Sequence, residues 1–200
     1  MTFLDENFDK TEFDSRLRWF NAPGRWWCDA ASSALVIEPE AGTDFWRKTH
    51  YGFEADSGHF LSAAVSGDFV MTGKVKFLPA HQYDQAGLMV RAGGNCWIKT
   101  SVEHEDDEPP KLGVVVTNGG YSDWSVQSFD PARNKLWLRI SRKNADFVVE
   151  HSHNGESWEL LRIAHLHLEA SASMDCGVYA CSPKGAGFRA EFDLLRIDRE

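Results

Sequence analysis

The stretch GDFVMTGKVKF, residues 67–77, decides the fold class of this chain. Apolar side chains recur in it at alternate positions, and polar side chains fill most positions between them. The apolar set is Phe69, Met71, Val75 and Phe77, and the polar set is Asp68, Thr72, Lys74 and Lys76. A period of two places one set on each face of a β-strand. The stretch therefore predicts a strand with one buried and one wet face, as is common in antiparallel sheets.

Similar segments occur elsewhere along the chain, separated by clusters of Gly, Asn, Asp and Pro. They cover residues 34–38, 82–91, 96–104, 112–118, 135–142, 146–152, 158–164, 177–182 and 188–198. Helical periodicity is weak, and residues 58–65 are the best candidate for a turn or two of helix. About ten strands with no helical layer predict an all-β, antiparallel, two-sheet jelly-roll sandwich. No composition break divides residues 1–200, so we expect a single domain.

Composition restricts the partners of the protein. Its 200 residues include 21 Lys and Arg against 30 Asp and Glu, a formal net charge of -9. This charge repels phosphate backbones and anionic lipids, so we expect neither nucleic acid nor a membrane as partner. The acidic start MTFLDENFDK lacks the pattern of a signal peptide, which favours a cytoplasmic protein. No zinc spacing or nucleotide-binding motif occurs, so we predict neither metal nor cofactor, and the four Cys are expected to be buried thiols.

Two central strands carry the main candidate site. In residues 83–91 and 96–103 the apolar residues point one way, and a mixed polar and aromatic set points the other way. The short Gly-Gly-Asn connection pairs the strands, which groups Tyr83, Gln85, Arg91, Trp97, Lys99 and Glu103 in one patch. Aromatic rings among charged hydrogen-bonding groups suit sugars. The alternative is a solvated face with cross-strand ion pairs from Lys99 or Arg91 to Glu103.

Two segments expected between strands extend this candidate site. Residues 44–53 add Asp44, Trp46, Lys48, His50 and Tyr51, and residues 121–125 add Asp123 and Trp124. Ligand-binding groups commonly lie on such connections. We expect Trp46, Trp97 and Trp124 to be stacking platforms, and Trp137 and Trp158 to fill the core.

Catalytic candidates are fewer. His59 suits proton transfer because an unperturbed histidine titrates near neutral pH, and Glu103 is its expected partner. The alternative for His59 is a structural role. The run EHEDD, residues 103–107, places carboxylates two positions apart, as on glucanase strands, but residues 105–110 are acidic and bounded by Pro, which is typical of a solvated loop.

Six segments in order carry a resemblance to a known family. They are DFWRKTHYGF (44–53), DSGHF (56–60), YDQAGLMVR (83–91), WIKTSVE (97–103), YSDWS (121–125) and ACSP (180–183). Over almost its whole length the chain resembles the regulation-of-enolase-like family, a domain of unknown function grouped with the concanavalin A-like lectins and glucanases. The resemblance implies a curved two-sheet jelly roll and cytoplasmic residence. It implies no established catalytic residues.

Three functions are open at this point. The first is non-catalytic binding of a carbohydrate or similar small polar molecule on the concave sheet. The second is an intracellular enzyme acting on a sugar-like substrate, in which Glu103 and His59 exchange protons while Lys99 and Arg91 hold anionic groups. The third is a regulatory module whose acidic surface docks on a metabolic enzyme. A monomer and a homodimer are both compatible with the sequence.

Overall fold

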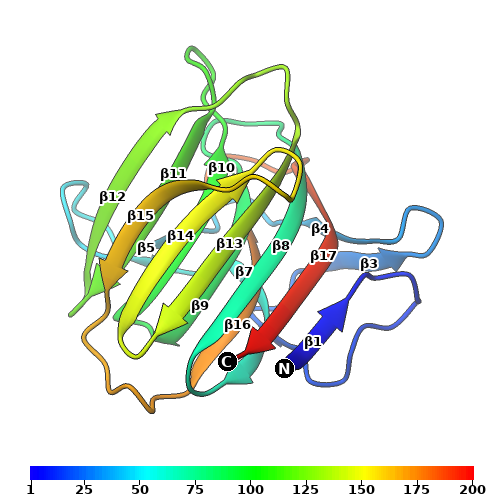
Figure 1. Cartoon of the computed structure of the whole chain (residues 1–200). Helices are drawn as coiled ribbons and strands as arrows, with labels where there is room; N and C mark the ends of the chain where they lie inside the picture. The colour runs from blue at the N-terminus through cyan, green and yellow to red at the C-terminus, as the bar shows by residue number, and fades with distance from the viewer.

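The chain folds into seventeen strands in the computed structural model, which describes residues 1–200 (Figure 1). The structure contains no helix that could span a membrane. The strands are β1 (Thr2–Glu6), β2 (Arg18–Phe20), β3 (Arg25–Asp29), β4 (Ala34–Glu38), β5 (Phe45–Trp46), β6 (Ala55–Asp56), β7 (His59–Val65), β8 (Phe69–Leu78), β9 (Gln85–Gly93), β10 (Cys96–Glu103), β11 (Lys111–Asn118), β12 (Tyr121–Ser128), β13 (Lys135–Lys143), β14 (Asp146–Ser152), β15 (Glu159–His165), β16 (Met174–Cys181) and β17 (Arg189–Arg199).

Two large sheets lie face to face as the layers of a sandwich (Figure 1). The eight-stranded sheet has the order β15-β14-β13-β8-β17-β4-β3, with β1 also paired to β17. The seven-stranded sheet has the order β12-β11-β10-β9-β16-β7-β2, and β5 and β6 form a small ribbon of their own. The strands within each sheet pair antiparallel. The predicted all-β, antiparallel, two-sheet architecture is confirmed.

The hydrophobic core lies between the two large sheets. It contains 36 buried residues, drawn from the inward positions of both layers. Strand β8 shows the rule, because its burial alternates residue by residue, with Phe69, Met71 and Val75 buried and Thr72 and Lys74 only half-buried on the other side. The predicted face of this strand is therefore confirmed. The apolar residues on the outer face of the seven-stranded sheet do not belong to this core.

Two predicted local structures are wrong. Within residues 58–65, His59–Val65 form strand β7 rather than helical turns, because β7 pairs with β16 on one side and β2 on the other, and these pairings outweigh a weak helical pattern. Residues 121–125 lie on β12, an edge strand that pairs with β11, rather than between strands. The four cysteines are free; Cys176 and Cys181 are buried, whereas Cys28 and Cys96 are only half-buried.

The two tryptophans expected in the core lie outside it. Trp137 alternates with the buried Leu136 and Leu138, so its side chain points to the outer face of the eight-stranded sheet, where it is half-buried. The Lys74 ammonium lies 4.8 Å from its ring centroid. Trp158 is also half-buried, with the Arg139 guanidinium 4.0 Å from its ring centroid. Both rings cover cationic side chains instead of filling the core.

Candidate functional site

The segment that contains β5 and β6 covers the outer face of the seven-stranded sheet. A second apolar cluster forms beneath it, from Phe45, Trp46, Phe60, Met89, Trp97, Val115, Tyr179 and Cys181. The Phe45 ring centroid lies 6.4 Å from that of Trp97 and 6.1 Å from that of Tyr179. A Cβ on Gly58 would lie 2.3 Å from the Phe45 ring, so only glycine permits this approach. The segment is therefore packed firmly onto the sheet.

This cover overturns the expectation that Trp46 and Trp97 are stacking platforms. Trp97 has 0% of its surface exposed and Trp46 has 7%, so neither presents a free ring face. Trp124 is half-buried and packs against the same cluster, with its indole over Gly113. Strand alternation placed Trp97 on the correct face of the sheet, but the face is covered by the chain itself.

A buried polar network lies beside these rings. The Lys99 ammonium donates to Gln85 Oε1 at 2.8 Å and to Asp44 Oδ1 at 3.3 Å. The Gln85 amide nitrogen donates to Glu103 Oε2 at 3.1 Å, and the Tyr179 hydroxyl donates to Gln85 Oε1 at 3.2 Å. Lys99 and Gln85 are buried. The network therefore links a charged pair, an amide and a carboxyl group through one side chain, Gln85.

The register of β9 and β10 explains how three of these side chains meet. Glu103 stands opposite Gln85, and Lys99 lies four residues before Glu103 on the same face of β10, opposite Met89. The predicted grouping of Gln85, Lys99 and Glu103 on one face therefore matches the structure. The expected ion pairs differ, because Lys99 pairs with Asp44 and Arg91 pairs with Asp56 at 2.8 Å.

Glu103 has an unusual environment for a carboxyl group. It ends β10 and is half-buried. Burial raises its pKa to about 8; Lys99 opposes this increase, whereas Asp44 and Glu105 add to it. At neutral pH Glu103 therefore carries its proton, and its hydroxyl group is able to donate a hydrogen bond.

The polar network ends near four exposed or half-buried residues that we call the mouth: Tyr51, Tyr83, Glu103 and Glu105. Tyr51 is 54% exposed and Tyr83 is half-buried. The pKa of the Tyr83 hydroxyl is raised, mainly by burial and then by the charges of Glu105, Glu103, Tyr51 and Asp106. These groups therefore lie close enough to Tyr83 for their charges to affect the ionisation of its hydroxyl group.

Asp84 and Ser182, which are not among the sequence-based candidates, hold the turn next to Tyr83 in place. Asp84 is fully buried, and its Oδ2 accepts hydrogen bonds from the backbone N–H groups of Ala80 and His81, both at 2.8 Å. Its other oxygen accepts a hydrogen bond from the Ser182 hydroxyl at 2.5 Å. Asp84 thereby joins the turn before β9 to the turn after β16. A lone Asp before a strand gives no signal of this role, because its partner Ser182 is 98 residues away.

The predicted pair of Glu103 and His59 is wrong. His59 precedes Phe60, which lies in the outer cluster, so its side chain points to the opposite face of the seven-stranded sheet from Glu103. Both ring nitrogens are engaged: Nδ1 lies 2.6 Å from the Asn21 carbonyl oxygen, and Nε2 lies 2.6 Å from Glu40 Oε2. His59 therefore holds the chain together locally, as the structural alternative predicted.

Three further candidates also lie away from the mouth. Asp123 is exposed on the edge strand β12 and pairs with the Arg162 guanidinium at 3.3 Å. The Lys48 ammonium lies 5.3 Å from the ring centroid of Tyr121. Arg91 lies at the opposite end of β9 from Gln85. The structure thus brings Asp44, Tyr51, Tyr83, Gln85, Lys99 and Glu103 into one site and separates it from these three.

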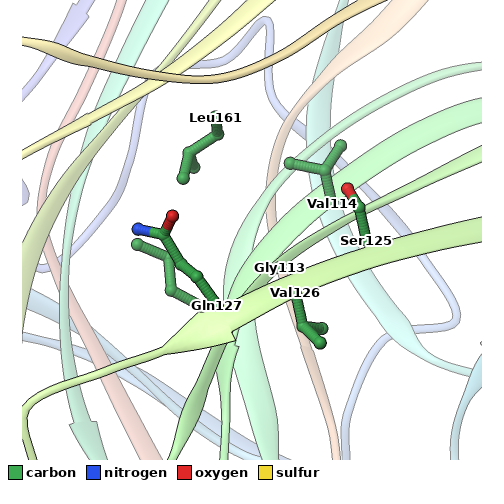
Figure 2. A pocket seen from close by; sticks show the side chains of 7 residues that line it. Gly113, Val114, Ser125, Val126, Gln127 and Leu161 are labelled. Atoms are coloured by element: carbon green, nitrogen blue, oxygen red, sulfur yellow. The ribbon is translucent and has the colours of Figure 1, made fainter.

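A different hollow lies at the open side of the sandwich, between the edge strands of the two sheets (Figure 2). It is lined by Leu112, Gly113, Val114, Ser125, Val126, Gln127 and Leu161. Val126 is exposed on the outer face of the seven-stranded sheet, and Leu160 and Ile163 are exposed on the outer face of the eight-stranded sheet. No sequence-based site residue lines this hollow. No group of three or more His, Cys, Asp or Glu residues in the chain is placed to hold a metal ion.

Residues 19–200 match the family described as a protein of unknown function, DUF1349. The chain belongs to this family. It is 33% identical over 174 residues to Regulation of enolase protein 1 from Saccharomyces cerevisiae, covering 87% of this chain and 85% of the relative. This DUF1349 protein also superposes on the crystal structure of a functionally unknown protein from Saccharomyces cerevisiae, with a TM-score of 0.85, 31% identity, and coverage of 93% of this chain and 97% of that one.

More distant similarities concern only the fold of the DUF1349 protein. The GH43 BlXynB protein from Bacillus licheniformis matches 98% of this chain with 39% of its own, at 16% identity and a TM-score of 0.78. A beta-1,3-glucanase from Mycobacterium marinum matches 99% of both chains at 10% identity and a TM-score of 0.60. The predicted jelly-roll sandwich and the resemblance to the regulation-of-enolase-like family are confirmed.

A substitution of Trp97 tests whether the covered face stabilises the fold. We expect Trp97→Ala to lower the free energy of unfolding by about 3–5 kcal/mol, because it leaves a cavity under Phe45. The exposed Tyr51→Ala should change it by less than about 0.5 kcal/mol. Urea denaturation of both variants measures the difference. A Trp97→Ala variant as stable as the wild type would contradict the assignment of this ring to a core.

Glu103 predicts a pH dependence of stability. Its folded-state pKa of about 8 lies above the ordinary value of 4.5. The contribution of Glu103 to the free energy of unfolding is therefore fully present below about pH 4.5 and is lost as pH rises through 8. Because glutamine does not titrate, the Tm of wild type minus that of Glu103→Gln should fall by several degrees between pH 5 and pH 9, at about 2–4 °C per kcal/mol.

Thermal melts of the exposed Glu156→Gln give the control, because its difference from wild type should stay constant over the same pH range. A constant difference for Glu103→Gln as well would show that its carboxyl group is ordinarily solvated.

Proposed function

We propose that this protein binds a carbohydrate or sugar-like polar ligand at the mouth, without turning it over. The observation that carries the proposal is the buried polar network of Lys99, Gln85 and Tyr179 that ends at the partly exposed Glu103. Asp44 Oδ2 and Glu103 Oε1 accept no hydrogen bond within the chain, and neither atom is buried. A charged acceptor beside a protonated carboxyl group offers sugar hydroxyls both an acceptor and a donor.

Aromatic side chains at the mouth supply a surface for the apolar face of a sugar. Tyr51 and Phe53 are exposed, with ring centroids 6.4 Å apart, and His50 packs edge-on against Tyr51 at 4.8 Å. Exposed aromatic residues gathered at one place are typical of a ligand surface. In this proposal Tyr51 and Phe53 of the covering segment take the stacking role that the sequence suggested for Trp46 and Trp97.

The geometry favours binding over catalysis. Proton exchange between Glu103 and His59 needs both groups in one cleft, and they lie on opposite faces of a sheet. The fold shared with a beta-1,3-glucanase does not indicate a glucanase activity, since one fold supports many functions. The ligand is therefore proposed to leave the mouth unchanged.

A thermal-shift screen against neutral mono- and oligosaccharides, followed by calorimetric titration of each hit, tests the proposal. A bound sugar should raise the Tm by mass action. We expect Tyr51→Ala and Glu103→Ala each to weaken binding at least about tenfold, which corresponds to 1.4 kcal/mol. Lys48→Ala and Asp123→Ala, which alter candidate residues outside the mouth, should bind as the wild type does. A sugar whose affinity is unaffected by the mouth variants, or no sugar at millimolar concentration, would overturn the proposal.

A second candidate is a protein partner at the open side of the sandwich. The name of the relative, Regulation of enolase protein 1, suggests enolase, and such contact would take place in the cytoplasm. The supporting observation is the pair of exposed apolar residues Leu160 and Ile163, which lie on the same face of the edge strand β15. Immobilised enolase should bind the wild type and Tyr51→Ala, and should bind the double variant Leu160→Ser, Ile163→Ser at least about tenfold more weakly. No binding of wild type at physiological salt would exclude this candidate.

A further inference from the structure

We propose that the ligand of the mouth carries a primary ammonium group beside its hydroxyls, so that the saccharide is an amino sugar. This inference rests on the proposed function and makes its ligand class narrower. It is argued from three features of the mouth: the sign of its charge, the side chain that now lies on Tyr83, and the open polar atoms near Glu103.

Carboxylates lie at the mouth. Glu105 belongs to it, and Asp106, Asp107 and Glu108 follow directly in the sequence, whereas Glu103 is protonated at neutral pH and adds no charge. The charges of Glu105 and Asp106 both raise the pKa of the Tyr83 hydroxyl. A phosphate or a uronate would be repelled here, whereas an ammonium group would be attracted.

An ammonium group of the chain already lies on one of the mouth tyrosines. The Nζ atom of Lys184 is 5.4 Å from the ring centroid of Tyr83, within the range of a cation–π contact. Lys184 is exposed and forms no ion pair with any carboxylate of the chain. Its contact with the ring is therefore made without an ion pair, so the Tyr83 ring already accepts an ammonium group at this point.

The turn that carries Lys184 allows this side chain to be replaced. Ser182 anchors the start of the turn to the buried Asp84, and Lys184 lies two residues further on with an exposed side chain. A ligand ammonium that reaches Tyr83 would displace a flexible side chain and would leave the fold unaltered. The hydroxyls of the same ligand would then reach the open oxygens of Glu103 and Asp44, and its ring would face Tyr51.

Calorimetric titration with two oligosaccharides of equal length separates the ammonium from the sugar. The probes are a glucosamine oligomer and an N-acetylglucosamine oligomer, at pH 6 and 150 mM salt, because they differ in the charge and the acetyl group on the same nitrogen. A cation–π contact of about 0.5–2 kcal/mol predicts that the glucosamine oligomer binds about 2- to 30-fold more tightly. Tyr83→Leu should abolish this preference.

Two lysine variants provide a matched comparison. Lys184→Gln removes the competing ammonium, so it should strengthen binding of the glucosamine oligomer about threefold or more. Lys48→Gln is the control, because the Lys48 ammonium makes the same kind of contact with Tyr121 at 5.3 Å, away from the mouth. It should leave both affinities unchanged.

The outcomes distinguish this inference from the proposed function. Equal affinity for the two oligomers, still weakened by Tyr51→Ala, would overturn the amino-sugar inference and leave sugar binding in place. Absence of binding by both oligomers and by neutral sugars would overturn the proposed function itself. A lysine-containing tetrapeptide that binds as tightly as the glucosamine oligomer, with the same response to Tyr83→Leu, would overturn the assignment to a saccharide.

Discussion

The buried ammonium of Lys99 is the constraint on which the outer face of the seven-stranded sheet depends. A charge removed from water requires a partner, and Lys99 finds one in Asp44, which belongs to a distant segment of the chain. Asp44 directly precedes Phe45, so the segment that neutralises the ammonium also brings an aromatic ring down onto Trp97 and Tyr179. The charge of Asp44 also adds to the raised pKa of Glu103. Charge pairing, aromatic packing and part of this increase in pKa thus depend on one segment of the chain.

Most of the fold could be predicted from the sequence, because in an antiparallel strand with one wet face the alternation of apolar and polar residues shows which side chains face the core. The alternation in β8, β9 and β10 fixed which side chains face the core, and the Gly-Gly-Asn turn between β9 and β10 was enough to place Gln85 near Lys99 and Glu103. The strands β7 and β12 were missed because pairing on a neighbouring strand decides them, and the local pattern of each segment is weak.

The candidate site was harder to predict, because alternation identifies the face of a side chain but says nothing of what covers that face. Trp97 has the pattern of an exposed ring on a wet face, and its burial depends on Phe45, which lies 52 positions earlier in the sequence. His59 shows the reverse problem: it shares a strand with site-facing residues, but a shift of one position sends it to the other side of the sheet. Contacts between distant segments therefore decided both cases.

Backbone conformation supports the assignment of the mouth as the functional region. Seven residues other than glycine have positive φ angles; two of them are Tyr83, which belongs to the mouth, at 70°, and His50, which packs against Tyr51, at 63°. Such conformations cost free energy and persist where the surrounding structure enforces them. For Tyr83 the enforcing contacts are the hydrogen bonds of the neighbouring Asp84, which fix the turn from both sides. A turn held in this way keeps the Tyr83 ring in place before any ligand arrives, and a ring that is already positioned adds to affinity without a further entropic penalty.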